Sequence, residues 1–204
     1  MKVLLINGSP RKEGNTHLAL AEAADKLNKL NIETETVSIG TKAVRSCIAC
    51  GRCKETGANR CTFDDDICNT IADKMQHCDG LIIGSPVYYG QPNGAVLSLV
   101  QRLFFSAGTY FRGKPAAAVA VCRRGGASAA LQTMLMPFQI MSMPIVTSQY
   151  WNIVYGRSEG EAALDAEGMQ TMRTLAQNMA YMLRATENAA KPQYESVTPT
   201  NFIR

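Results

Sequence analysis

Short apolar runs alternate with longer amphipathic segments along this chain, and this alternation limits the possible folds more than any other feature. Continuous apolar runs at 3–7, 80–85 and 115–122 have the length of buried strands. Two more strands are expected, an edge-like one at 32–39 and one within 144–154. Segments with helical periodicity lie between and after these strands, at 16–30, 67–78, 95–105, 128–141 and 161–186. The sequence therefore predicts an α/β fold, a doubly wound five-stranded parallel sheet with helices on both faces.

The chain has the size and composition of one domain. Its 204 residues are 46% hydrophobic, which is enough to bury a core and a cofactor. We expect a domain at 1–187, with a cysteine-rich insertion at 46–61 and a polar tail at 188–204. The formal charge of +4 is spread over isolated Lys and Arg residues, so no nucleic-acid partner is expected. No apolar run is long enough to cross a bilayer, which predicts a soluble cytoplasmic protein without a membrane partner.

The loop after the first strand has the composition of an anion site. The segment NGSPRKEGNT at 7–16 runs from a buried strand into a helix and offers two Gly, side-chain donors at Ser9, Asn15 and Thr16, and the charge of Arg11. Amides at a helix N-terminus together with such side chains bind phosphate. The spacing matches neither a P-loop nor G-x-G-x-x-G. The alternative is that Asn15 and Thr16 only cap the helix.

Two further loops belong to the same edge of the predicted sheet, because the carboxyl ends of parallel strands lie together. The segment SPVYYGQPNG at 85–94 combines rigid Pro and flexible Gly with Tyr88 and Tyr89. The segment CRRGGAS at 122–128 is again rich in Gly, which allows close approach to a ligand. Each could be ordinary turn chemistry. Together with the anion loop, they favour a flat heterocycle that carries a phosphate.

These motifs carry a family resemblance. N-G-S-P-R-x-x-G-N-T (7–16) and G-S-P-V-Y-x-G (84–90) resemble the flavodoxin-like NAD(P)H-dependent FMN reductase superfamily, and the cysteine segment is similar to that of its iron–sulfur flavoprotein branch. The resemblance covers roughly 1–185 and implies the strand order 2-1-3-4-5. It also implies FMN-binding residues: Ser9, Arg11, Asn15 and Thr16 at the phosphate, Pro86, Val87, Tyr88, Tyr89 and Gly90 at the ring, and Arg123, Gly125 and Gly126 on its other side.

Four of the seven cysteines are crowded into one short segment, as Cys47-x2-Cys50-x2-Cys53-x7-Cys61. An odd number with this crowding is typical of metal or redox chemistry in a reducing compartment. The spacing favours a [4Fe–4S] cluster, since iron in such clusters prefers thiolate ligands. Zinc is an alternative, although structural zinc usually takes two separated C-x-x-C pairs. Reduced thiols without metal are the third possibility.

The remaining sulfur-containing and histidine residues have simpler interpretations. Cys68, Cys78 and Cys122 are expected in the core. His17 and His77 lack a partner at motif spacing, so we expect helix caps or solvent-exposed groups. The apolar segment around 134–143 predicts core and a subunit contact, through Met134, Met136, Phe138, Ile140, Met141 and Met143.

These interpretations lead to three functional hypotheses. In the first, an FMN-dependent oxidoreductase or electron-transfer flavoprotein passes electrons between FMN and a [4Fe–4S] cluster. In the second, a clusterless reductase uses NAD(P)H to reduce FMN, which then reduces a quinone, a nitro compound, a metal ion or free flavin. In the third, a zinc-stabilised module binds a nucleotide without turnover. No catalytic side chain is expected, because the flavin carries the chemistry. NAD(P)H would dock transiently, the partner would be a redox protein or a small-molecule acceptor, and a homodimer or homotetramer is expected.

Overall fold

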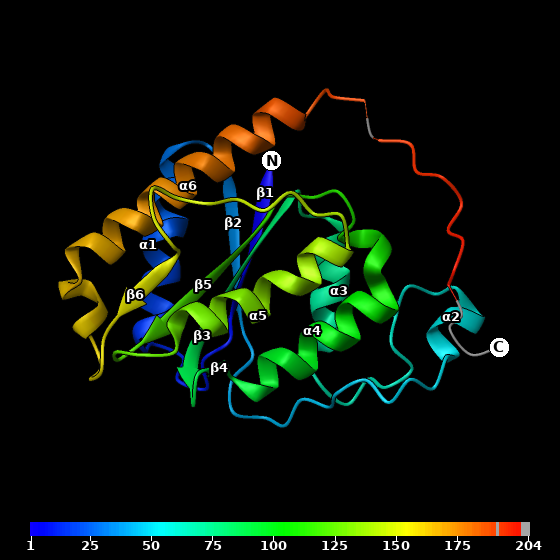
Figure 1. Ribbon diagram of the computed structural model, residues 1–204, viewed down its shortest axis with the longest axis horizontal. Helices are drawn as coiled ribbons and strands as arrows, with labels where there is room; N and C mark the ends of the chain where they lie inside the picture. The colour runs from blue at the N-terminus through cyan, green and yellow to red at the C-terminus, as the bar shows by residue number, and fades with distance from the viewer. Residues whose placement is uncertain (191, 201–204) are drawn as a thin grey trace.

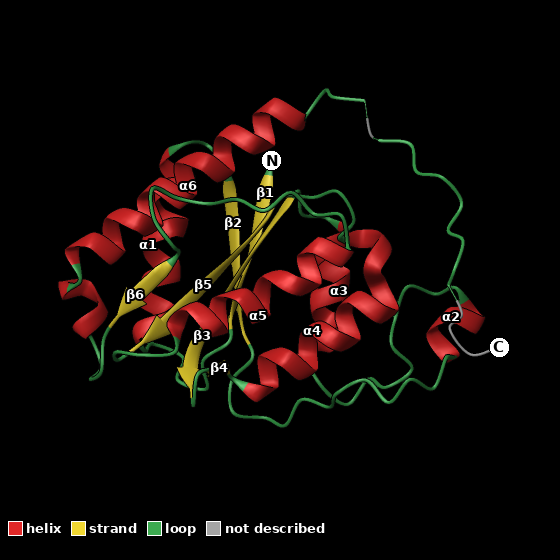
Figure 2. Ribbon diagram, viewed as in Figure 1, coloured by secondary structure: helices red, strands yellow, loops and turns green. Residues whose placement is uncertain are grey.

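A single parallel sheet forms the centre of the molecule (Figures 1 and 2). The computed structural model describes residues 1–190 and 192–200. The parallel strands are arranged in the order β2-β1-β3-β5-β6. They are β1 (Lys2–Asn7), β2 (Glu33–Ser38), β3 (Gly80–Tyr88), β5 (Ala116–Cys122) and β6 (Ile153–Tyr155). Because β5 and β6 are the fourth and fifth parallel strands, the predicted order 2-1-3-4-5 is confirmed.

Helices cover both faces of this sheet. On one face lie α1 (Asn15–Lys29) and α6 (Ala166–Thr186), which pack against each other. On the other face lie α3 (Cys68–Gln76), α4 (Gly94–Ala107) and α5 (Ala127–Ile140), as Figure 1 shows. This doubly wound arrangement is the predicted one.

The core is divided by the sheet into two layers. In β1, Leu4 and Ile6 belong to the layer under α3, α4 and α5, whereas Val3 and Leu5 belong to the layer under α1 and α6. Side chains alternate between the faces of a strand, so a strand buried on both faces is apolar throughout. This explains the continuous apolar runs in the sequence. The edge strand β2 is partly exposed, which agrees with its alternating pattern.

The observed elements differ from the predicted ones in several places. The strand expected within 144–154 is limited to 153–155, and Ile145 makes only an isolated bridge to Ala116. The helix expected at 161–186 is divided into η2 (Glu161–Leu164) and α6, because the Asp165 carboxylate accepts a hydrogen bond from the Gly168 amide and caps α6. Three short elements were not predicted, α2 (Arg52–Thr56), the antiparallel β4 (Gln91–Pro92) and the 3-10 helix η1 (Gly108–Tyr110). All three are too short to show periodicity.

Three predictions about buried residues have clear outcomes. Cys68, Cys78 and Cys122 are buried, as expected. The apolar segment around 134–143 is divided: Met134, Phe138 and Met143 are buried, Met141 is partly buried, and Met136 and Ile140 are exposed. His77 is exposed at the end of α3 and His17 is half-buried in the first turn of α1.

The segment after α6 has no regular structure at 190 or at 192–200, while positions 191 and 201–204 of the predicted tail lie outside the described residues. The predicted division at 187 stays a prediction. Within the described part of the chain, no helix is long and apolar enough to cross a membrane.

Candidate functional site

The loops that follow β1, β3, β5 and β6 lie at the same edge of the sheet, at the lower end of the strands in Figure 1. Most residues expected to bind FMN belong to these loops or to the helix turn that follows the first of them. The segment expected as a loop from position 85 begins later, because Pro86, Val87 and Tyr88 still belong to the end of β3 and pair with neighbouring strands. In open parallel sheets this edge is where ligands bind. The fold therefore brings together segments that are more than a hundred residues apart in the sequence.

Buried Asn7 at the end of β1 shapes the first loop. Its Oδ1 accepts a hydrogen bond from the Ser9 amide at 3.1 Å, and its Nδ2 donates to the Lys12 carbonyl at 3.3 Å. Ser9 Oγ in turn accepts from the Arg11 amide at 3.1 Å. Ser9 and Thr16 are buried, and Arg11 is exposed. The loop thus leads into the first turn of α1, where backbone amides lack helical partners and attract anions.

The Asn15 side chain holds the loop after β6. Its Nδ2 donates to the Ser158 carbonyl at 2.8 Å, and its Oδ1 accepts from the Ala162 amide at 3.1 Å. Sequence reasoning assigned Asn15 to the phosphate and did not detect these partners, which follow it by more than 140 positions. Asn15 connects the start of α1 to the start of η2.

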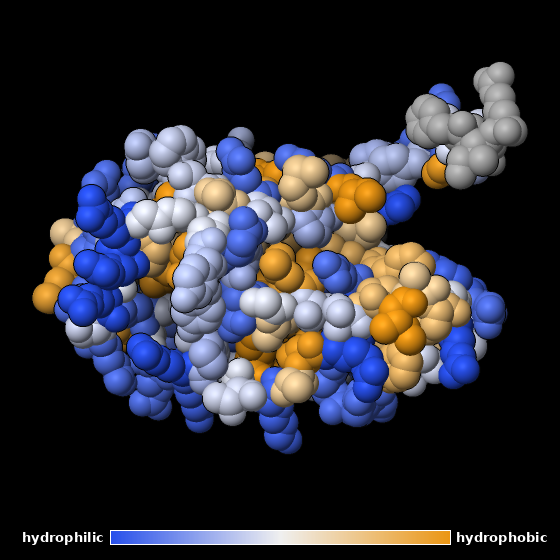
Figure 3. All heavy atoms as spheres, turned by 60° about the horizontal axis from the view of Figure 1, so that its bottom comes forward, coloured by the Kyte–Doolittle hydropathy of each residue, from blue (hydrophilic) through white to orange (hydrophobic). Residues whose placement is uncertain are grey.

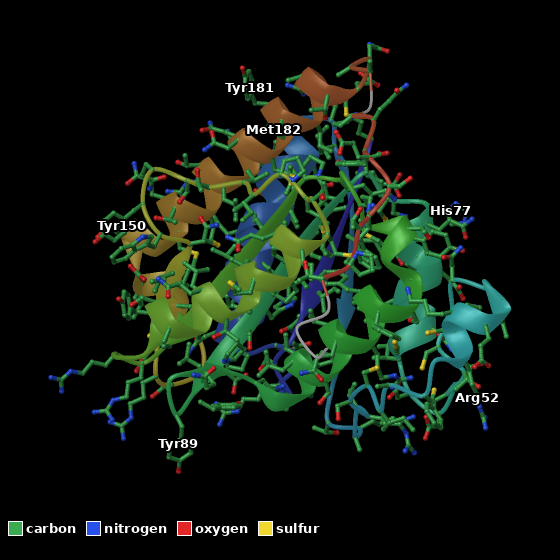
Figure 4. All side chains as sticks on the ribbon, turned by 45° about the vertical axis from the view of Figure 1, so that its right-hand side comes forward. Arg52, His77, Tyr89, Tyr150, Tyr181 and Met182 are labelled. Atoms are coloured by element: carbon green, nitrogen blue, oxygen red, sulfur yellow. The ribbon has the colours of Figure 1, made fainter. Side chains whose placement is uncertain are left out.

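The second loop presents its two tyrosines at the surface. Tyr88 is 46% exposed, and Tyr89, with φ of 50°, is fully exposed at the turn between β3 and β4. Tyr89 points away from the body of the protein in Figure 4. Pro86 and Val87 are half-buried below them. An exposed aromatic pair above a rigid turn can contact a planar ligand.

Asn93 connects the second loop to the first, and sequence reasoning missed it. Its Nδ2 donates to the Gly8 carbonyl at 2.8 Å, its amide donates to Ser85 Oγ at 2.9 Å, and its Oδ1 accepts from the Ala95 amide at 3.0 Å, which caps α4. The position of an Asn before a helical pattern was the available signal.

The third loop touches the second through glycine. Gly126 has φ of +85°, and a Cβ at this position would lie 2.7 Å from Gly90 Cα. Only glycine allows this approach. Arg123, Gly125 and Gly126 are exposed. The three loops therefore form one continuous surface, and the individual roles of their residues toward FMN stay predictions.

The four clustered cysteines border one small hollow of about 20 Å³ next to α4. Cys53 is buried, Cys47 and Cys61 are half-buried and Cys50 is exposed. Burial raises the pKa of the Cys53 thiol. The Ala49 amide donates a hydrogen bond to Cys47 Sγ at 3.4 Å.

The backbone of the cysteine segment makes several sharp turns. Residues in the left-handed region recur along it, at Ala49, Gly51, Gly57 and Asn59. Even so, among the described residues no three His, Cys, Asp or Glu side chains are arranged to hold a metal ion. The four thiols of the cysteine segment border the same hollow, but in this structure their sulfur atoms are not arranged around a common centre.

Arg102 of α4 also borders this hollow, and sequence reasoning missed it. Its side chain is only 1% exposed and forms an ion pair with Asp66, whose side chain is 4% exposed. Its Nε donates to Cys61 Sγ at 3.4 Å. Burial opposes the charged form of Arg102, but the hydrogen bond to Cys61 and the Asp66 carboxylate raise the pKa of the guanidinium. A single Arg within the apolar pattern of α4 was the available signal.

Comparison with known proteins identifies clear relatives. Residues 1–157 match the family of NADPH-dependent FMN reductases. An iron–sulfur flavoprotein of Methanocaldococcus jannaschii is 37% identical over 192 residues, which cover 90% of this chain and 98% of that protein. An iron–sulfur flavoprotein of Methanosarcina thermophila is 31% identical over 189 residues, which cover 90% and 95% of the two chains.

The fold is also found in solved structures. A flavodoxin from an archaeon matches with a TM-score of 0.61 at 13% identity, over 90% of this chain and 99% of that chain. At this identity the likeness concerns the fold alone, and it agrees with the strand order of the central sheet.

Proposed function

Because the chain belongs to the NADPH-dependent FMN reductase family, in its iron–sulfur flavoprotein branch, we propose that this FMN-dependent oxidoreductase passes electrons between FMN and a [4Fe–4S] cluster. The cluster ligands would be Cys47, Cys50, Cys53 and Cys61. The observation that carries the proposal is that these four thiols border one hollow, although the first and last lie fourteen positions apart.

The first part of the proposal concerns the flavin site. Ser9, Arg11 and Thr16 would hold the FMN phosphate at the start of α1, where the buried hydroxyls and unpaired amides offer donors. Asn15 would act there by fixing the 158–162 loop.

Residues of the other two loops would border the isoalloxazine ring, namely Pro86, Val87, Tyr88, Tyr89, Gly90, Arg123, Gly125 and Gly126. The bound flavin supplies the exchange between two-electron and one-electron partners, and the protein binds and orients it. NAD(P)H is the proposed transient donor, and a redox protein or a small molecule is the proposed acceptor.

The donor set of the cysteine loop fits an iron–sulfur cluster. Thiolates are the ligands that such clusters use, and backbone amides that donate to sulfur are part of their usual surroundings. Cys50 is exposed and Cys53 is buried, so the side chains would have to turn toward a common centre when iron binds. All seven cysteines lie within the described residues and are free, which supports a reducing location such as the cytoplasm.

A second candidate function is a clusterless NAD(P)H-dependent reductase. The observation that favours it is that, among the described residues, the thiols of the cysteine segment are not arranged as the ligands of a metal ion. A zinc-stabilised nucleotide-binding module has less support, because membership of an FMN reductase family indicates turnover.

Anaerobic reconstitution tests the proposal. Purified protein treated with iron and sulfide should bind about four irons per chain and absorb broadly near 400 nm. Cys50→Ser should lose most of this iron and retain FMN, because the flavin loops are separate from the cysteine loop. Cys78→Ala, which alters a buried thiol outside this loop, is the matched control and should bind iron like the wild type. If the wild type binds no iron, or Cys50→Ser binds as much, the clusterless reductase is the better account; bound zinc in place of iron supports the third hypothesis.

A further inference from the structure

We propose that Arg102 is a positioning residue for the cysteine-bound cluster, which fastens the loop to α4 and holds a positive charge against one ligand sulfur. This inference rests on the proposed function, since it concerns how the chain holds and tunes that cluster. It assigns a role to a residue outside the cysteine motif.

The contacts of Arg102 reach both sides of the cysteine segment. Before the first cysteine, the Arg45 carbonyl accepts from the guanidinium at 3.2 Å. After the last cysteine, the Phe63 carbonyl accepts at 2.9 Å, and the Asp66 carboxylate forms the ion pair. The remaining nitrogen of the guanidinium, Nε, donates to Cys61 Sγ at 3.4 Å. One side chain therefore closes the segment at 45–66 and contacts a proposed ligand directly.

Asp66 completes this closure. Its Oδ2 accepts from the Arg45 amide at 3.0 Å and its Oδ1 accepts from the Cys68 amide at 3.0 Å. Oδ2 thus joins the end of the segment to its start, and Oδ1 fixes Asp66 to the first turn of α3. The two charges satisfy each other, which is the condition under which a buried ion pair is tolerated.

Burial makes a purely structural explanation of Arg102 incomplete. A buried ion pair is costly to desolvate, and apolar side chains of similar volume often stabilise a core equally well. The buried side chains near Arg102 on α4 are the apolar Leu99 and Leu103 and the small Ser106, whose hydroxyl donates to the Arg102 carbonyl at 2.7 Å. What an apolar residue could not supply are donors toward the Arg45 and Phe63 carbonyls and toward the Cys61 sulfur, and only the last of these reaches a proposed cluster ligand. The planar guanidinium also directs several N–H groups at fixed angles, which Lys does not.

This donor has a chemical consequence for the cluster. A [4Fe–4S] centre with four thiolate ligands is negatively charged, and one-electron reduction adds a further negative charge. Net charge and hydrogen bonds to sulfur are factors that set the reduction potential of such centres. Arg102 should therefore stabilise the reduced form more than the oxidised form and raise the potential.

The experiment uses the full-length, FMN-loaded protein, reconstituted with iron and sulfide and titrated with dithionite while the reduced cluster is followed by electron paramagnetic resonance. The main variant is Arg102→Gln with Asp66→Asn, which removes both charges together and leaves none unpaired. The equilibrium constant for one-electron reduction should fall about tenfold, which corresponds to a fall of about 59 mV in midpoint potential. Arg52→Gln is the matched control, because Arg52 is exposed beside Cys53 on α2 and points to solvent in Figure 4. It should shift the potential by less than half as much.

Arg102→Lys separates the charge from the shape of the side chain. The midpoint potential of Arg102→Lys should be closer to that of the wild type than the potential of the double variant is, because Lys retains the charge. Arg102→Lys should nevertheless lose iron to a chelator at least about threefold faster than the wild type, since it lacks the forked donors of Arg. If the double variant retains FMN but binds no iron, the positioning role is supported. Unchanged potential and iron loss in the double variant, or wild-type behaviour of Arg102→Lys in both measurements, would overturn the inference while the cluster itself stands. A wild type that binds no iron overturns the proposed function as well.

Discussion

At the scale of single residues, buried and half-buried polar side chains hold the irregular backbone of both sites. Asn7 and Asn93 bond to the loops at the flavin edge, and Arg102 bonds to the segment around the cysteines. Loop amides and carbonyls that leave water need partners, because an unpaired buried polar group costs free energy. These three residues supply such partners from rigid strands and helices. Side chains of the protein therefore fix the backbone conformation of the flavin and cysteine loops.

Asn15 offers the sharpest test of the anion loop. Asn15→Asp places a carboxylate at the start of α1 and removes the donor to the Ser158 carbonyl. Like charges repel, so we expect FMN affinity to fall at least about tenfold in a fluorescence titration. Asn28→Asp makes the same change of charge near the other end of α1 and should leave the affinity unaltered. Equal affinity of Asn15→Asp and the wild type would contradict this placement of the phosphate.

The buried carboxylate of Asp66 predicts a specific loss of stability in acid. Burial alone would raise its pKa, but hydrogen bonds from the Cys68 and Arg45 amides and from Arg102 hold the pKa below its ordinary value. The ionised form thus contributes stability above the ordinary pKa of about 4, and this contribution is lost as the pH falls below it.

Asp66→Asn, measured by thermal unfolding across pH, should show both parts of this effect. At neutral pH the free energy of unfolding should decrease by about 3 kcal/mol, because Arg102 loses its partner. As the pH falls below about 4 the difference from the wild type should shrink, since Asp66 of the unfolded wild-type chain then binds a proton that the folded protein still excludes. Parallel stability curves for the two proteins would show that Asp66 does not titrate in this way.

Residues with local signals could be predicted from the sequence, and residues with distant partners could not. The helix-entry motif correctly placed Ser9 in the loop after β1 and Thr16 at the start of the helix, and Cys68 was correctly placed in the core. The partners of Asn15 follow it by 143 and 147 positions, so no local pattern indicated them. The partners of Arg102 precede it by 36 to 57 positions, and its helix was correctly predicted while its role was not.

At the scale of elements, α4 is a rigid connection between the two sites. Its cap, Asn93, bonds to the first flavin loop, and Arg102 and Phe105 border the cysteine hollow. Nine residues of helix separate Asn93 from Arg102, a rise of about 14 Å. The long elements were predictable because periodicity accumulates over their length. The five-residue α2 and the two-residue β4 depend on tertiary contacts and showed no such signal.

The contact between the second and third loops can be tested with adjacent glycines. Gly126→Ala forces a side chain into positive φ and against Gly90, so the loops must separate. We expect a loss of about 1 kcal/mol or more in stability and weaker FMN binding. Gly125→Ala is the matched control for stability, because a Cβ there meets nothing within 4 Å. Thermal unfolding and flavin titration of both variants measure the difference, and identical results for the two would exclude a role for this contact.

At the scale of the whole molecule, apolar side chains are exposed beyond the two sites. Met136 and Ile140 on α5 are 64% and 74% exposed. Tyr150 and Trp151, whose tilted rings lie 5.2 Å apart between centroids, are 61% and 58% exposed. Apolar surface is also exposed at the edge that carries the flavin and cysteine loops. Figure 3 looks onto this edge, where orange apolar surface interrupts the blue hydrophilic surface. Exposed apolar patches of this kind are typical of protein–protein contacts.

The exposed apolar side chains of Met136 and Ile140 predict that the protein forms a homodimer or homotetramer in which α5 is part of the contact. Met136 and Ile140 are four positions apart and share one face of the helix, so Met136→Glu with Ile140→Glu would place two charges in the interface. Burying unpaired carboxylates is costly, and the double variant should therefore dissociate to monomers in light scattering at micromolar concentration. Tyr181 of α6 is 72% exposed, and α6 lies on the face of the sheet opposite to α5. Tyr181→Glu should therefore leave the assembly intact. A wild type that is monomeric with FMN bound would refute the assembly, and a double variant that stays associated would remove α5 from the contact.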